Sequence, residues 1–372
     1  MGRLEVYLNM SGKRSLAVTF YRGGATTYQL SNQFPIAKQK VIEHKYDELI
    51  QLIAQDRVAR KSSRGTGSSS SYRVSRKIKH FGYRLFRLLC GERRNLELDR
   101  LIGDDKYLQL CLDENTRLLP WELAFDGEDF LCTRYEVARI SAIKDPKFQS
   151  DSNIYHHGRA LVIGCNYYSE DREDDLTSLE YCDREAEQVS GRLEKLGFSV
   201  ALAVDENATK ENVLAFLKEG VDVFHFTGHA GFNKTLAHDE SGKLCLYDED
   251  VTTRDLEKAF SRNGAPLLSF MNGCESGREK YIASAWEPHK GMASAFLDHG
   301  AGVFVGTFWP VDDRPSKQLS VKFYDKLAKG ATIGEAMRAT RLFCKLSRSQ
   351  GFRETWPAYV VYGDPELTLT EY

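Results

Sequence analysis

The sequence predicts an α/β protein in which a mostly parallel sheet is flanked by helices. From residue 159 onward, short apolar runs alternate with longer segments whose apolar residues recur at helical spacing. Strands that alternate with helices are joined by right-handed crossovers, and these produce a parallel sheet covered on both faces. The length of 372 residues is sufficient for two domains, and 42% hydrophobic residues is ordinary for a globular chain.

Residues 1–150 form a smaller N-terminal α/β region. Strand-like alternation is expected over 3–10, 15–22 and 25–31, followed by a helix over 41–55. The stretch at about 61–72 is rich in serine, glycine and basic residues and predicts a flexible exposed linker. Further elements are expected as a helix over 80–91, a strand over 107–113, a short helix over 119–125 and a strand over 129–140. This region shows no constellation that indicates chemistry.

Residues 151–372 form the second and more regular region. Strands are expected over 159–168, 199–206, 222–229, 265–274 and 301–310. Helices are expected over 178–198, 207–220, 255–264, 291–300, 316–330 and 332–346. In parallel sheets, reactive residues collect where the carboxyl ends of the strands meet loops.

Composition and motifs exclude several classes of function. The net charge of −2 gives no overall basic field, so we expect no nucleic-acid partner. No apolar run is long enough for a signal peptide or a membrane span, which predicts a cytoplasmic protein without membrane association. The eight cysteines are scattered singly without any CxxC pair, so we expect no metal site and a reducing compartment. We expect no cofactor, because no phosphate-binding P-loop is present.

Two predicted strands end in a reactive residue beside a glycine, His229 after 222–228 and Cys274 after 265–273. Neighbouring parallel strands lie about 4.8 Å apart, so the two side chains would come within a few ångströms of each other. A lone cysteine or histidine at a strand end is usually structural. The pairing of the two at equivalent strand ends favours a thiol and its imidazole partner.

Such a pair would attack a peptide bond. Cys274 would be the nucleophile, and His229 would favour the thiolate and protonate the leaving amine. The backbone N–H of Cys274, with that of Ala230 or Gly231, would hold the oxyanion. The spacing of His225 and His229 lacks the glutamate of a helical HExxH metalloprotease, and His225 is expected in the core. Neither a cysteine-phosphatase loop nor a GxSxG elbow is present.

The second region resembles the CHAT domain, a branch of the caspase, metacaspase and separase group of cysteine peptidases. The resemblance lies in HFTGHAGF, SGKLCLYDEDVTTRDL, LLSFMNGCESG, GMASAFLDHGAGVFVGTFWPVDD and WPAYVVYGDP, in the family's order from about 159 to 365. TRLLPWELAFDGEDFLCTRYEVARI resembles the segment that precedes the domain in these proteins. The resemblance implies a caspase-like fold, a degenerate protease-like N-terminal half, and catalytic roles for His229 and Cys274.

Some positions depart from the family pattern. Ala230 stands where the family commonly has glycine. Asn272 stands where metacaspase-like relatives often have an aspartate that selects a basic residue, so basic specificity does not follow from that position. Asp312 and Asp313 are alternative acidic groups for a substrate pocket, although a solvated turn explains them equally well.

The resemblance also implies regulation. Caspase-like enzymes are commonly inactive until a loop is cut or a partner binds. We therefore expect a protein substrate, an upstream activating protease or sensor, and activating cleavage near Arg278 and Lys280 or within 60–77, with ordinary solvated loops as the alternative. The prediction is a cysteine endopeptidase in a bacterial defence or cell-death pathway. The alternative is a non-catalytic caspase-like scaffold.

Overall fold

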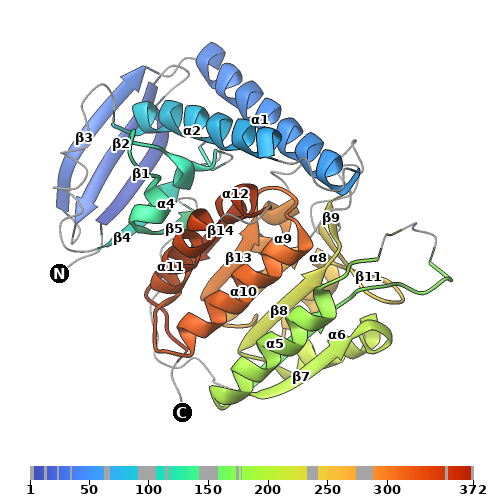
Figure 1. Ribbon diagram of the computed structural model, residues 1–372. Coiled ribbons are helices and arrows are strands. Elements are labelled where there is room, and N and C mark those ends of the chain that lie inside the picture. The colour runs from blue at the N-terminus through green and yellow to red at the C-terminus, as the bar shows by residue number, and fades with distance from the viewer. Residues whose placement is uncertain are drawn as a thin grey trace. The chain divides into compact units, whose positions relative to one another are not determined.

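The computed structural model describes residues 4–11, 15–22, 25–33, 36–62, 68–90, 106–113, 116–117, 119–141, 158–172, 176, 178–232, 242–273, 288–347 and 351–369 (Figure 1). Two compact units make up the chain, one of 1–149 with 337–357 and one of 150–336 with 358–372. The segment 337–357 was expected in the second region. It joins the first unit because the Trp356 ring packs on that of Phe130, with centroids 5.1 Å apart, and Lys345 pairs with Asp129.

The sheet of the first unit begins as an antiparallel meander and continues as parallel strands. Its order is β3-β2-β1-β4-β5, with β1 pairing antiparallel to β2 and parallel to β4. Alternate residues such as Leu4, Val6 and Leu8 are buried, as period-2 patterning requires. The strands are β1 (Leu4–Ser11), β2 (Ser15–Arg22), β3 (Ala25–Gln33), β4 (Tyr107–Leu112) and β5 (Glu136–Ser141). The helices are α1 (Ile36–Ser62), α2 (Ser68–Cys90), η1 (Trp121–Leu123), α4 (Leu131–Arg134) and α12 (Phe352–Thr355).

The predicted linker at 61–72 is largely helical. Helix α1 continues to Ser62 and α2 begins at Ser68, while 63–67 lie outside the described residues. Helix α2 is longer than predicted because Val74 and Ile78 are buried and continue the helical rhythm of Phe81 and Leu85 toward the N-terminus. The serine-rich composition concealed that rhythm.

The sheet of the second unit confirms the mostly parallel sheet flanked by helices. Its order is β14-β13-β12-β8-β6-β7, in which every pair is parallel except β13 with β14. The strands are β6 (Arg159–Gly164), β7 (Ser199–Val204), β8 (Val223–Gly228), β12 (Leu268–Gly273), β13 (Val303–Thr307) and β14 (Tyr359–Gly363). A separate antiparallel sheet, not predicted, contains β9 (Ala230–Phe232), β10 (Gly242–Cys245) and β11 (Asp250–Thr252).

Helices cover both faces of this sheet. Apolar side chains such as Phe224 and Phe226 belong to the core that includes residues of α6, α8 and α9. Strand residues that point to the other face of the sheet face α5 and α10, which lie side by side (Figure 1). On that face Phe270 contacts Phe323. The helices of this unit are α5 (Cys182–Lys195), α6 (Lys210–Glu219), α8 (Thr253–Phe260), α9 (Pro288–Leu297) and α10 (Asp313–Leu327), with the short turn η2 (Asp205–Asn207). Helix α11 (Ile333–Leu346) and the turn η4 (Trp356–Ala358) cross the unit boundaries, and most of their residues belong to the first unit. Among the described helices, none is long and apolar enough to cross a membrane.

Candidate active site

Strands β8 and β12 are parallel neighbours, and their carboxyl ends are in register. Gly228 pairs with Gly273, so the next residue along each strand is His229 on one side and position 274 on the other. Cys274 itself, like Arg278 and Lys280, lies outside the described residues. The register supplies the neighbouring strand ends on which a Cys–His pair depends.

His229 is held by a residue of the loop that follows β6. Its side chain is buried, and its backbone N–H donates to the Tyr168 hydroxyl at 3.2 Å. The two rings stack with centroids 5.6 Å apart and an interplanar angle of 29°. On its other side the His229 carbonyl accepts from the Cys245 N–H at 2.9 Å. Both the backbone and the ring plane of His229 are therefore fixed.

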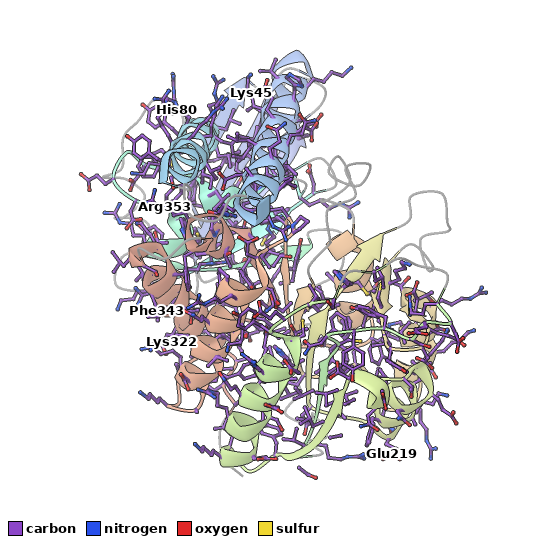
Figure 2. The ribbon with its side chains drawn as sticks, turned by 45° about the vertical axis from the view of Figure 1, so that its right-hand side comes forward. Lys45, His80, Glu219, Lys322, Phe343 and Arg353 are labelled. Carbon is purple, nitrogen blue, oxygen red and sulfur yellow. The ribbon has the colours of Figure 1, made fainter. Side chains whose placement is uncertain are left out.

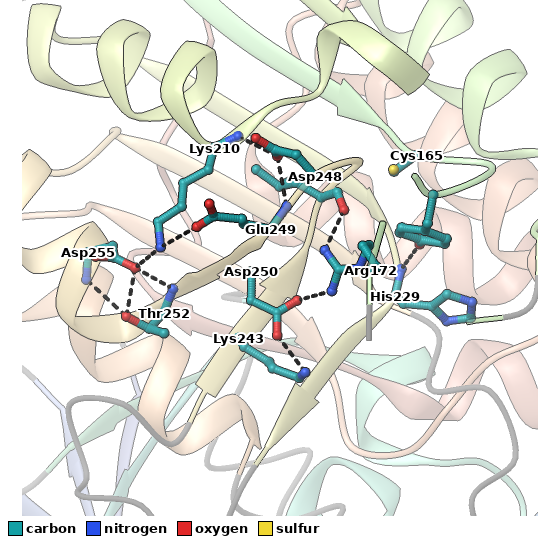
Figure 3. A network of polar contacts seen from close by, with 12 residues as sticks. Cys165, Arg172, Lys210, His229, Lys243, Asp248, Glu249, Asp250, Thr252 and Asp255 are labelled. Carbon is teal, nitrogen blue, oxygen red and sulfur yellow. Dashed lines mark hydrogen bonds and ion pairs between the residues drawn. The ribbon is translucent and has the colours of Figure 1, made fainter. Parts of the chain in front are cut away.

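Tyr168 is supported in turn by Arg172. The guanidinium lies 5.7 Å from the centroid of the Tyr168 ring, a cation–π distance. It also donates to the Leu246 carbonyl at 2.8 Å and to Asp250 at 2.6 Å, and Asp250 pairs with Lys243 at 2.5 Å (Figure 3). This network ties the loop after β6 to the small β9–β11 sheet. The only signal of this network in the sequence is an aromatic and a basic residue in a polar loop.

Two other cysteines near His229 are poor nucleophiles. Burial raises the pKa of Cys165 to about 12 and raises that of Cys245 further. A thiol that stays protonated attacks carbonyls poorly, because the thiolate is the reactive form. All of the described cysteines except Cys90 are buried.

The predicted oxyanion donors, Ala230 and Gly231, lie on β9 opposite β10. His229 and Cys245 form a hydrogen-bonded pair of this antiparallel ladder, and pair types alternate along such a ladder. The backbone N–H of Gly231, opposite Lys243, is thus directed at β10, whereas the backbone N–H of Ala230 is directed away from β10. A Cβ built on Gly273 would meet that of Ala230 at 2.7 Å, so the end of β12 runs close against Ala230. This geometry favours Ala230 over Gly231 as the donor.

A fully buried carboxylate, that of Glu185 on α5, lies behind the two strand ends. It accepts from the His225 imidazole Nε2 at 3.1 Å and from the Thr227 hydroxyl at 3.2 Å. The Asn272 amide donates to both of its oxygens, at 2.8 and 3.0 Å. His225 is in the core, as the sequence predicted. Thr227 and Asn272 each stand two residues before a predicted catalytic residue, so Glu185 clamps β8 and β12 at the level of the site.

Two tyrosines complete this network. The Tyr324 hydroxyl lies 3.3 Å from His225 Nδ1, and the Tyr359 hydroxyl donates to Asn272 Oδ1 at 2.6 Å. Burial and the charge of Glu185 raise the pKa of Tyr324 well above its ordinary value, so the phenol keeps its proton. The hydrogen-bond pattern then assigns the His225 proton to Nε2, where it points at Glu185.

The placement of Asn272 does not support a substrate contact by its side chain. The amide is buried, its donor is used by Glu185 and its acceptor by Tyr359. Asn272 was a candidate for the substrate pocket because metacaspase-like relatives often have an aspartate at that position, and only the structure shows which way the amide points.

Asp313 and Asp312 differ in their surroundings. Asp313 accepts from the N–H groups of Glu180 and Tyr181 at 2.8 and 2.9 Å and thereby fastens α10 to the start of α5. Burial raises its pKa to about 6, with the charge of Glu185 adding to the effect. Asp312 is half-buried at the N-cap position of α10. Across the described residues, no group of three or more His, Cys, Asp or Glu side chains is placed to hold a metal ion.

Comparison with known proteins agrees with this geometry. The family model of the CHAT domain matches residues 81–364. The chain belongs to the CHAT domain family. The CHAT match begins within α2, so it includes part of the first unit as well as the sheet that carries His229. A comparison with curated proteins found none that matches.

Solved structures extend the comparison of this CHAT chain. It is similar to the separase chain of the Saccharomyces cerevisiae separase–securin complex, with a TM-score of 0.59 and 14% identity, covering 97% of this chain and 30% of that chain. Porphyromonas gingivalis RgpB matches with a TM-score of 0.47 and 13% identity, covering 79% and 69% of the two chains. Caspase-1 from Spodoptera frugiperda matches with a TM-score of 0.38 and 12% identity, covering 59% and 95%. The family and the separase match support a caspase-like protease fold.

Proposed function

We propose that the chain is a cysteine endopeptidase that cleaves protein substrates with Cys274 as nucleophile and His229 as general base. One observation carries the proposal: the carboxyl ends of β8 and β12 pair at Gly228 and Gly273, the residues that directly precede His229 and Cys274 in the sequence. The thiolate of Cys274 would attack the peptide carbonyl, and the imidazolium of His229 would return the proton to the leaving amine. The backbone N–H groups of Ala230 and Cys274 would stabilise the oxyanion.

The proposal extends to substrate choice and control. Asp312 and Asp313 are the acidic candidates for contact with a basic substrate side chain, and Asp313 also accepts from two backbone N–H groups. Cleavage near Arg278 and Lys280 is proposed as the activating event. A role in bacterial defence or cell death is supported by the family resemblance alone.

The test is cleavage of fluorogenic peptides that carry Arg, Lys, Asp, Met, Leu or Asn before the scissile bond. We expect turnover by the wild type, loss of turnover in Cys274→Ala and in His229→Ala, and full turnover in Cys90→Ala, which removes a thiol of the first unit. Alkylation by iodoacetamide, mapped by mass spectrometry, should be fastest at Cys274 and should slow in His229→Ala. Peptidase activity that persists in Cys274→Ala would refute the proposed nucleophile.

The alternative is a non-catalytic scaffold, and the same measurements separate the two. A scaffold would show no turnover before or after limited proteolysis, and no alkylation at Cys274 faster than at Cys90. An enzyme that awaits activation would show rapid alkylation of Cys274 or turnover after cleavage.

A further inference from the structure

One side of helix α2 carries only basic charge. The helix contains six Arg and Lys residues and no Asp or Glu. The basic face, as we name it, contains exposed Arg73, Arg76, Lys77, His80, Arg84 and Arg87. At 100° and 1.5 Å per residue, these positions fall within an arc of about 100° and extend for about 21 Å along the axis. His80 marks the middle of this face in Figure 2.

The opposite side of α2 is buried in the first unit. Val74, Ile78, Phe81, Leu85 and Leu89 are 4% exposed or less. A helix whose apolar side is already packed cannot insert that side into a lipid surface. The basic face is therefore available to a partner only through its charges and its flanking side chains.

Two exposed tyrosines border the basic face on the same edge. Tyr72 is 64% exposed and Tyr83 is 49% exposed. They are eleven residues apart, close to three turns, so they share one side of the helix, with Tyr72 one turn from Arg76 and Tyr83 one turn from Arg87. Exposed aromatic rings next to arginines are the elements with which proteins bind unpaired bases and phosphates, by stacking and by bidentate hydrogen bonds.

We propose that the basic face of α2 binds single-stranded nucleic acid, with Arg76 and Arg84 among the side chains on phosphates and with Tyr72 and Tyr83 stacked on bases. An acidic polypeptide would use the charges but not the tyrosines, and a duplex keeps its bases stacked on each other. The proposal departs from the expectation drawn from the net charge of −2, because that total conceals a segment with charge of one sign. It does not depend on peptidase activity.

Fluorescence anisotropy with the full chain tests the proposal. The probes are a labelled 20-nucleotide oligouridylate, the matching oligodeoxythymidylate, a 20-base-pair duplex and polyglutamate. We expect both single strands to bind, with a slope of log affinity against log salt of about −3 to −4 if five side chains contact phosphates. The stronger of the two single strands identifies the natural source as RNA or DNA.

Matched variants separate the basic face from general electrostatics. Arg76→Gln with Arg84→Gln should reduce the magnitude of the salt slope by about 1.4, and Tyr72→Ala with Tyr83→Ala should weaken binding by about tenfold or more. Lys195→Gln with Lys329→Gln removes two exposed charges from the second unit and should leave binding unchanged. Equal effects of the arginine and lysine pairs, no effect of the tyrosine pair, or tighter binding of polyglutamate or duplex would overturn the proposal.

Discussion

Replacing Glu185 should show how much the buried clamp behind the site stabilises the second unit. Its carboxylate is the acceptor for His225, Thr227 and Asn272, and the side chain is 0% exposed. Glu185→Ala leaves three buried donors without their acceptor, and each unsatisfied buried group costs about 1–3 kcal/mol. Glu185→Gln keeps one oxygen but presents an amide where two oxygens were needed, at about 1–3 kcal/mol.

The assay is urea unfolding, followed by fluorescence and extrapolated to water. Glu187→Gln is the control, because Glu187 lies exposed on the same helix and its loss should change stability by less than about 0.5 kcal/mol. If both Glu185 variants cost no more than Glu187→Gln, the carboxylate does not hold the network and the reasoning is refuted.

The clamp should also matter for catalysis, given the proposed function. Because Thr227 and Asn272 each lie two residues before a predicted catalytic residue, a loosened clamp should misplace His229 relative to Cys274. We expect Glu185→Gln to lower kcat more than it raises KM, since it touches no substrate. A change confined to KM would contradict a positioning role.

Three further predictions follow from the same region. The pKa of Asp313 is raised to about 6 in the folded state, so the stability that this residue contributes is present below about pH 4 and is lost as the pH rises through 6. The free energy of unfolding should fall by about 2–3 kcal/mol over that interval. Asp313→Asn should abolish this pH dependence in unfolding experiments. Gly273→Ala should destabilise by about 1–3 kcal/mol and impair turnover, since its Cβ meets Ala230, and a variant as stable and active as the wild type would contradict this approach. Tyr168→Phe should keep the stacking of the two rings but remove the hydroxyl that accepts from the His229 N–H. The free energy of unfolding should fall by about 1–3 kcal/mol, measured by thermal unfolding. An unchanged melting temperature would argue against the hydrogen bond between Tyr168 and His229.

The sequence was sufficient to predict the mostly parallel sheet and the neighbouring ends of β8 and β12. Local patterns, apolar runs and helical periodicity, define the strands around His225 and Met271, and the parallel connection rule makes their carboxyl ends neighbours. The predicted Cys–His pairing remains a prediction for Cys274, although the register on which it depends is present.

Side-chain partnerships were not predictable in the same way. Nothing in the sequence connects Glu185 with Asn272, 87 positions away, because their meeting depends on how α5 crosses the sheet. The sequence likewise does not show which way the Asn272 side chain points, and that direction decides whether Asn272 is a pocket residue or a core residue. The sequence predicted a helix that begins at residue 80, whereas α2 begins at Ser68. The serines suggested a linker, and the burial of Val74 and Ile78 depends on tertiary packing.

The chain passes between its two units three times, near 149, 336 and 357. During synthesis, the sheet of the second unit therefore cannot be completed before β14 has been made, because β14 pairs with β13 and its Tyr359 hydroxyl donates to Asn272. The first unit likewise cannot be completed before residues 337–357 have been made. A nascent chain that ends shortly after the strand before Cys274 would still lack strands of this sheet, among them β14, and a member of the clamp, so it should not present a finished site. The same interleaving means that residues 151–372 produced alone would display Trp356 without the Phe130 ring on which it packs, and would be prone to aggregate.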